Sequence, residues 1–255
     1  MENTEIAWTD STFNIAWGCT KISPGCQHCY ADSFSNRYGH DVWGKNKERR
    51  TFGEKRWAEP LKWNREAESH GVRRRVFCAS MCDYMEDHPT IDAEREKLWP
   101  LIRQTPWLEW QLLTKRAERI ADNLPADWGA GYENVWLGVS VESDEYAWRF
   151  NEHLAHIPCK VRFVSYEPAL GPVTKLDWEK LGWIIYGAES GAKFRPDNID
   201  WARHVRNKCA EFEIPFFYKQ TAAFRAGTNP QLDGETIQQF PFAVEKVEEV
   251  LEGVI

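Results

Sequence analysis

Residues 134–165 read NVWLGVSVESDEYAWRFNEHLAHIPCKVRFVS, and their pattern of apolar side chains predicts the architecture of the chain. Residues 134–141 and 160–165 are apolar runs rich in β-formers, and each ends in polar residues. Residues 145–156, between them, have helix-like spacing. Two buried strands joined by a helix form the right-handed crossover unit of which parallel sheets are built.

This pattern recurs along the rest of the chain. Near-continuous apolar runs are typical of parallel strands that are buried on both faces. Residues 91–104 and 199–212 have helical spacing, and Thr114 followed by KRAERI resembles a helix start. We therefore expect an α/β fold, a partial (β/α) barrel of about six parallel strands, with an open doubly wound sheet as the alternative. The other apolar runs are residues 12–17, 75–80, 109–114, 182–186 and 214–218.

One large domain is expected over residues 1–222, followed by a C-terminal extension at 223–255. The charged segment 39–71 is interpreted as an irregular insertion between the first two strands. No stretch approaches the ~20 apolar residues that span a bilayer. The acidic N-terminus lacks the apolar core of a secretory signal. We therefore expect no membrane segment and a cytoplasmic location.

Charge is uneven along the chain. The net charge of −7 argues against a generally basic, nucleic-acid-binding surface. Residues 45–75, however, hold more Lys and Arg than Asp and Glu, with Phe52, Trp57 and Trp63 interleaved. Such a face could bind nucleic acid through phosphate attraction and base stacking. The alternative is a solvated face that serves solubility.

Three of the seven cysteines lie close together. Cys19, Cys26 and Cys29 have the spacing C-x6-C-x2-C, in a loop that follows the first predicted strand. An odd number of cysteines in a cytosolic chain argues against a disulfide framework. Three interpretations stay open: a [4Fe–4S] cluster with one open iron, a zinc site with His28 or a distant residue as fourth ligand, or three free thiols.

Polar residues follow nearly every predicted strand. In barrels and open parallel sheets, ligands bind at the carboxyl-terminal edge of the strands. Any one of these residues could instead be a cap or a turn residue. The residues are Ser80, Asp83, Thr114, Lys115, Ser140, Glu142, Ser165, Glu167, Glu189, Ser190, Lys219 and Gln220.

The segment from Cys19 to Ala31 resembles the three-cysteine motif of a radical-SAM-like phage protein family. The resemblance covers residues 7–222. The wider radical SAM superfamily usually has C-x3-C-x2-C, so the first gap is longer here. Further matching segments are SMCD (80–83), LLTKR (112–116), NVWLGVSVE (134–142), FVSYEP (163–168), GAESG (187–191) and FFYKQ (216–220).

The resemblance implies a partial barrel of the radical SAM type. It also implies a [4Fe–4S] cluster on Cys19, Cys26 and Cys29, with S-adenosyl-L-methionine (SAM) on the open iron. Cofactor-binding residues are implied after three strands. They are Ser80 and Asp83 near the SAM amino group, Ser140 and Glu142 near its ribose or carboxylate, and Glu189 and Ser190 beside the adenosine.

The chemistry implied is reductive cleavage of SAM to a 5′-deoxyadenosyl radical that abstracts a substrate hydrogen. Cys82 could return a hydrogen atom to a product radical, although a small buried filler is the commoner role of such a cysteine. Lys115 and Lys219 could pair with a substrate carboxylate or phosphate. Solvation or internal pairing is the alternative for both.

The resemblance points to isomerisation of an amino-acid-modified thymine during phage DNA hypermodification. The target base would have to be flipped or single-stranded, with residues 45–75 facing the DNA. The expected partners are DNA or a modified nucleobase and an electron donor; no oligomeric state is predicted. The alternatives are base repair like that of spore photoproduct lyase, or a non-enzymatic zinc-binding module.

Overall fold

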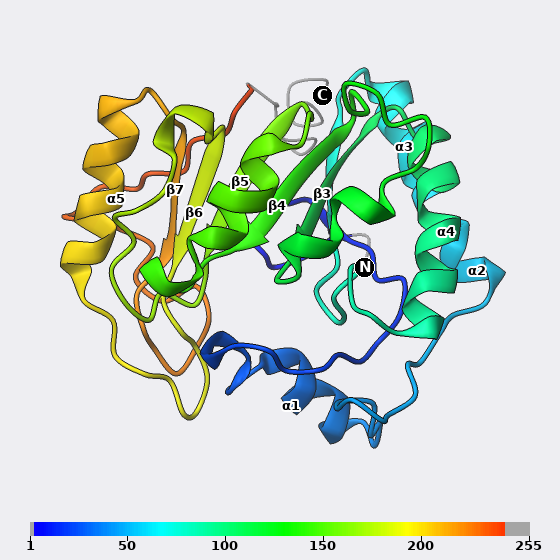
Figure 1. The fold of residues 1–255 in the computed structure, drawn as a ribbon, viewed down its shortest axis with the longest axis horizontal. Helices are drawn as coiled ribbons and strands as arrows, with labels where there is room; N and C mark the ends of the chain where they lie inside the picture. Colours follow the sequence, from blue (N-terminus) through cyan, green and yellow to red (C-terminus); the bar gives the residue numbers. More distant parts are fainter. Residues whose placement is uncertain (1–2, 243–255) are drawn as a thin grey trace, which may run out of the picture.

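The computed structural model describes residues 3–242, and its seven strands form one parallel sheet in chain order (Figure 1). Each strand pairs with the next, so β1 and β7 are the two edges of an incomplete α/β barrel. The predicted partial barrel is confirmed, with seven strands where about six were expected. The strands are β1 (Ser11–Thr12), β2 (Arg74–Cys78), β3 (Leu108–Thr114), β4 (Val135–Ser140), β5 (Val161–Tyr166), β6 (Trp183–Gly187) and β7 (Phe216–Gln220).

The first strand is much shorter than the apolar run at residues 12–17. Only Ser11–Thr12 forms β1, beside Val76 and Phe77. The Phe13 amide still donates to the Phe77 carbonyl at 3.0 Å. The chain then leaves the sheet, and the Trp17 amide donates to Arg50 instead. This departure delivers the cysteine loop to the edge of the sheet.

Two predicted helices are confirmed, whereas two other segments predicted to be helical form different structures. Helix α4 (Pro89–Arg103) starts at His88, whose side chain accepts from the Thr90 amide at 3.2 Å, and α5 (Ile199–Glu211) starts at Asn198. Residues 145–156 do not form one α-helix; 3₁₀ turns flank a π-helical segment at Arg149–His153. The stretch after Thr114 forms only the short 3₁₀ helices Ala117–Arg119 and Ala121–Asn123.

The segment 39–71 is not irregular throughout, because it contains α2 (Glu54–Trp57) and α3 (Glu59–His70). Pro60, Trp63 and Ala67 are buried at helical spacing, while the charged residues between them face water. Helix α3 ends at Gly71, which adopts the left-handed conformation with φ +69°. The charged residues of α3 therefore lie on the solvent side of a crossover helix.

Both faces of the sheet are apolar, with side chains alternating along each strand. One face packs against the helices, and Figure 1 shows α5 beside β7 and α3 and α4 at the other side of the sheet. The inner face forms a second, mainly aromatic core around Trp8. This core closes one end of the half-barrel. Its members are Trp8, Phe77, Trp136, Val161, Phe163, Trp183, Ile185 and Phe217.

The remaining structural expectations concern termini and membranes. Part of the predicted C-terminal extension, residues 243–255, lies outside the described residues. Among residues 3–242, no helix combines the length and the apolarity that crossing a bilayer requires.

Gly138 on β4 makes room for the ring of Phe163 on β5. A Cβ atom at residue 138 would lie 2.2 Å from Phe163 Cζ. We expect Gly138→Ala to lower the free energy of unfolding by roughly 1–3 kcal/mol, because the buried ring must shift. Urea denaturation measures this change. Gly53→Ala is the matched control, since no atom would approach its Cβ within 4 Å; equal losses in the two variants would contradict the packing argument.

Candidate active site

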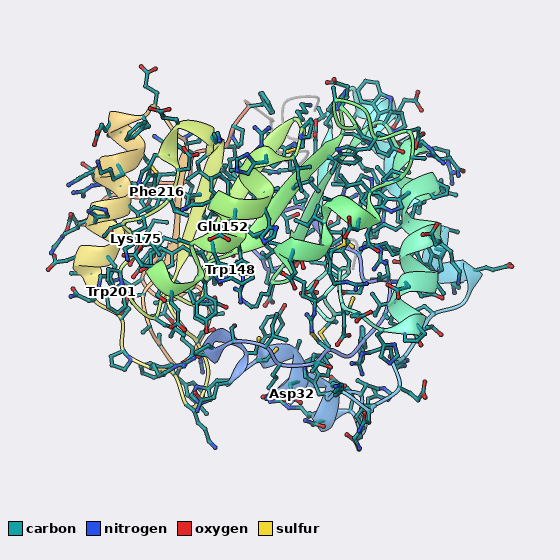
Figure 2. The ribbon with its side chains drawn as sticks, viewed as in Figure 1. Asp32, Trp148, Glu152, Lys175, Trp201 and Phe216 are labelled. Atoms are coloured by element: carbon teal, nitrogen blue, oxygen red, sulfur yellow. The ribbon has the colours of Figure 1, made fainter. Side chains whose placement is uncertain are left out.

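A cavity of about 680 Å³ opens at the carboxyl-terminal edge of the sheet. In Figure 2, Phe216 marks the start of β7 and Asp32 marks α1 (Tyr30–Arg37), which lies beyond the opposite ends of the strands. The cavity lies between the sheet and the loop that precedes α1. Cys19, Cys26 and Cys29 all line it.

The structure brings nearly all predicted site residues to this one cavity. Besides the three cysteines, the residues that line it are Ser80, Cys82, Asp83, Lys115, Ser140, Glu189 and Ser190. Glu142 does not line it. Thr114, Ser165, Glu167 and Lys219, which also follow strands, do. Their roles toward a cofactor or substrate stay predictions.

The Cys19 end of the loop is fixed by a buried ion pair. Glu86 and Arg49 form two hydrogen bonds, of 2.8 and 2.9 Å, and both side chains are nearly inaccessible to solvent. Glu86 Oε1 also accepts from the Thr20 amide at 2.7 Å. The Thr20 hydroxyl accepts from Arg49 at 3.1 Å. The backbone next to Cys19 is therefore held by charge-assisted hydrogen bonds.

Arg116 connects the same end of the loop to β2 and β3. Its Nη1 donates to Asp83 at 2.8 Å and to Cys19 Sγ at 3.7 Å, and its Nη2 donates to the Thr20 carbonyl at 2.9 Å. Asp83 also accepts from the Thr114 hydroxyl at 2.6 Å and the Lys115 amide at 3.0 Å. Asp83 is thus engaged by protein groups, and its role beside the SAM amino group stays a prediction.

Burial raises the pKa of the Cys19 thiol to about 12, and the Asp83 charge adds to this rise while Arg116 opposes it. Burial likewise raises the pKa of Cys29. A metal binds the thiolate, so loading iron here must release protons. The Arg116 guanidinium is the donor placed to favour the negative charge on Cys19.

Glu142 holds the middle of the loop from behind the cavity wall. Its Oε1 accepts from the Ser23 hydroxyl at 2.8 Å and from Lys115 Nζ at 2.7 Å, and its Oε2 accepts from Arg149 at 2.8 Å. A Cβ on Gly25 would lie 2.5 Å from Oε1, so the loop packs directly on this carboxylate. Burial works to raise the pKa of Glu142, but Lys115 and Arg149 outweigh it and lower the pKa.

The far end of the loop is held by Glu189 after β6. Arg195 pairs with this carboxylate and also donates to the Pro24 carbonyl at 3.1 Å. His28 Nδ1 lies 3.2 Å from Glu189 Oε2. Burial alone would raise the pKa of Glu189, but the Arg195 hydrogen bonds lower it. Glu86, Glu142 and Glu189, each with an arginine, therefore fix the cysteine loop at three points.

The arginines of this arrangement were not predicted as site residues, although Arg116 ends the matching segment LLTKR. Arg49, Arg116, Arg149 and Arg195 come from segments far apart in the chain, and their pairing depends on the folded structure. Arg149 is also the first residue of the π-helical segment within residues 145–156. Its buried guanidinium reaches the Ser140 carbonyl at 2.9 Å, where the helix widens into a π-turn.

A second charged pair faces the cavity. Lys219 on β7 forms an ion pair with Glu167, which follows β5, across the intervening strand β6. Gly187 on β6 permits this contact, because a Cβ there would lie 2.9 Å from the Glu167 carboxyl carbon. Both side chains are about a fifth exposed. Lys219 and Lys115 are each paired with a carboxylate of the chain in this structure, and their roles toward a substrate stay predictions.

Cys82 and Ser80 lie on the segment that follows β2. Asn14 fixes this segment, since its Oδ1 accepts from the Met81 amide at 2.7 Å and its Nδ2 donates to Ser80 Oγ at 3.1 Å. Burial, together with the neighbouring Cys78, raises the pKa of Cys82 well above its ordinary value. Cys82 is therefore a protonated thiol at the cavity wall.

In the part of the chain that the structure describes, no group of three His, Cys, Asp or Glu side chains converges as one ion requires. His28, the suggested fourth zinc ligand, has its Nδ1 beside Glu189. In a [4Fe–4S] cluster each thiolate binds a different iron, so the three sulfurs need not converge. Three thiols around one cavity are the donor set that such a cluster uses.

Part of the predicted basic, aromatic face at residues 45–75 is buried. Trp63 is only 1% exposed and packs in the core. Arg49 is buried against Glu86, and Arg75 is buried against Asp10 at 2.8 Å. Phe52 and Trp57 are partly buried, and most lysines and arginines of this segment stay exposed, so nucleic-acid binding by this face stays a prediction.

Comparisons with known proteins gave limited matches. No curated protein matches the chain. A double mutant of spore photoproduct lyase with bound AdoMet and dinucleoside spore photoproduct has a TM-score of 0.44 and 12% identity, over 78% of this chain and 61% of that one. Spore photoproduct lyase complexed with the dinucleoside has a TM-score of 0.41 and 13% identity, over 77% and 60%.

At these scores the two structures carry no argument about activity, and the chain spans about three fifths of their length. The match to a family is much broader. The family described as "Protein of unknown function (DUF5131)" matches residues 3–244, almost the entire sequence. The chain therefore belongs to the DUF5131 family.

Proposed function

We propose that this chain is a radical SAM enzyme whose [4Fe–4S] cluster is held by Cys19, Cys26 and Cys29. One observation carries the proposal: three thiols from a single loop line one cavity at the carboxyl-terminal edge of a parallel half-barrel. This edge is where such folds bind ligands. The three ligands would leave one iron of the cluster open for the amino and carboxylate groups of SAM.

When bound, the cluster and SAM supply a 5′-deoxyadenosyl radical that abstracts a hydrogen from the substrate. The chain must orient the cofactor and exclude water. Trp8, Phe77 and Leu113 form an apolar part of the cavity wall. Ser80, Ser140 and Ser190 offer polar groups to the cofactor at the ends of three strands. Cys82 offers a thiol hydrogen to a product radical.

We propose further that the substrate is an amino-acid-modified thymine in DNA, and that the reaction is an isomerisation. The Glu167–Lys219 pair supports an amino-acid group as the recognised part, because Lys219 complements a carboxylate and Glu167 an ammonium group. Glu142 orients Lys115, whose Nζ lies at the cavity wall for a second anionic group. An electron donor must supply the reducing electron.

The cluster assignment is tested by loading the chain with iron and sulfide without oxygen. We expect the wild type, with dithionite and SAM, to form 5′-deoxyadenosine measured by mass spectrometry. Cys19→Ala, Cys26→Ala and Cys29→Ala should each reduce this product at least about a hundredfold, because each loses a cluster ligand. Cys159→Ala is the matched control, since Cys159 lies outside the cavity. One bound zinc, or equal activity in all four variants, would contradict the proposal.

Arg116 should raise the reduction potential of the cluster, because it donates to Cys19 Sγ. Hydrogen bonds and positive charge near cluster sulfurs stabilise the reduced form. We expect Arg116→Gln to shift the midpoint potential to a more negative value in an anaerobic titration followed by electron paramagnetic resonance. Arg119→Gln is the control, since Arg119 pairs with Asp87 and Asp92 instead. An unchanged potential in Arg116→Gln at full iron content would refute the assignment.

A further inference from the structure

Exposed rings gather at the edge of the sheet that carries the cavity. Among the described residues, every exposed large hydrophobic side chain except Phe242 lies at this edge. A cluster of exposed apolar side chains marks a binding surface more reliably than scattered ones do. The residues are Ile22 on the cysteine loop, Tyr30, Phe34 and Tyr38 on or next to α1, Phe194 after β6 and Phe224 after β7.

Two of these rings lie on adjoining loops. Ser190 and Ala223 form a parallel bridge, and the Gly191 amide donates to the Ala223 carbonyl at 3.1 Å. Ser190 and Gly227, on the same two loops, line the cavity. Figure 1 shows the loop between β6 and α5 at the same edge of the molecule as α1. The two loops therefore form one side of the cavity mouth.

Each of these rings has an exposed cation as its neighbour in sequence. Lys193 precedes Phe194, which is 40% exposed, and Arg225 follows Phe224, which is 66% exposed. Within residues 3–242, neither cation forms an ion pair with a carboxylate. We name Lys193, Phe194, Phe224 and Arg225 the ring–cation surface.

The carboxylates on these two loops are already engaged. Glu189 pairs with Arg195. Asp197 accepts from the Thr221 hydroxyl at 3.2 Å and from the Ala222 amide at 3.3 Å. Loops 188–198 and 221–230 therefore carry three cations, Lys193, Arg195 and Arg225, against two carboxylates, although the whole chain carries −7.

We propose that the ring–cation surface binds an unpaired stretch of nucleic acid and leads one base toward the cavity. Every base offers a face on which an aromatic ring can stack, and each nucleotide adds one phosphate that a neighbouring cation can hold. Each of the two joined loops carries one ring next to one cation, which matches the one base and one phosphate of each nucleotide. The inference rests on the proposed function for the base's destination, but the binding itself requires neither iron nor SAM.

The test measures fluorescence anisotropy of a labelled single-stranded oligothymidylate with the full-length chain, without SAM. We expect Phe194→Ala and Phe224→Ala each to raise Kd about tenfold, because each removes one stacked base. Lys193→Gln and Arg225→Gln should each reduce the slope of log Kd against log salt by roughly 0.7. Phe242→Ala is the matched control, because Phe242 is 44% exposed but not part of this surface.

Three results would overturn the inference: no binding by the wild type, an equal loss in Phe242→Ala, or binding to anionic phospholipid vesicles in place of the oligonucleotide. Thermal melting of each variant separates misfolding from lost binding.

SAM cleavage without substrate is measured in parallel. If 5′-deoxyadenosine forms but the oligonucleotide does not bind, the proposed binding surface is contradicted and the proposed function stands. If the oligonucleotide binds but no 5′-deoxyadenosine forms, the proposed function is contradicted and the binding surface stands.

Discussion

The site depends on the anchoring of one irregular loop by buried charge. Residues 19–29 have little regular structure of their own, yet their three thiols must face one cavity. Glu86, Glu142 and Glu189 hold this loop, each paired with an arginine. Removing one partner of a buried ion pair leaves an uncompensated charge and typically costs about 3–5 kcal/mol. The charges therefore fix the loop geometry before any cofactor binds.

The parallel sheet makes this anchoring possible. Glu86 lies on the segment after β2, Glu142 after β4 and Glu189 after β6, and parallel strands deliver all three to the same edge. The long first gap of the cysteine motif also has a function here. Thr20 and Ser23 lie within it, and they are the residues that contact Glu86 and Glu142.

Sequence reasoning predicted the sheet and the contents of the cavity well. Strands buried on both faces give unmistakable apolar runs, and strand-end residues such as Ser80 and Ser190 meet wherever parallel strands end. It failed where long-range contacts override local pattern. Residues 145–156 contain a π-helical segment that starts at the buried Arg149, and the charged segment 39–71 contains α3, which packs through Trp63. The arginine partners carry no local signal, because each finds its carboxylate only in the fold.

The central claim is that three thiolates of one loop leave an iron open for SAM. Mössbauer spectroscopy of the chain loaded with isotopically enriched iron, recorded before and after SAM is added, tests it most directly. The account predicts a [4Fe–4S] signal in which a single iron site changes when SAM binds. A cluster with no site that responds to SAM, or a chain that retains zinc and no iron, would contradict it.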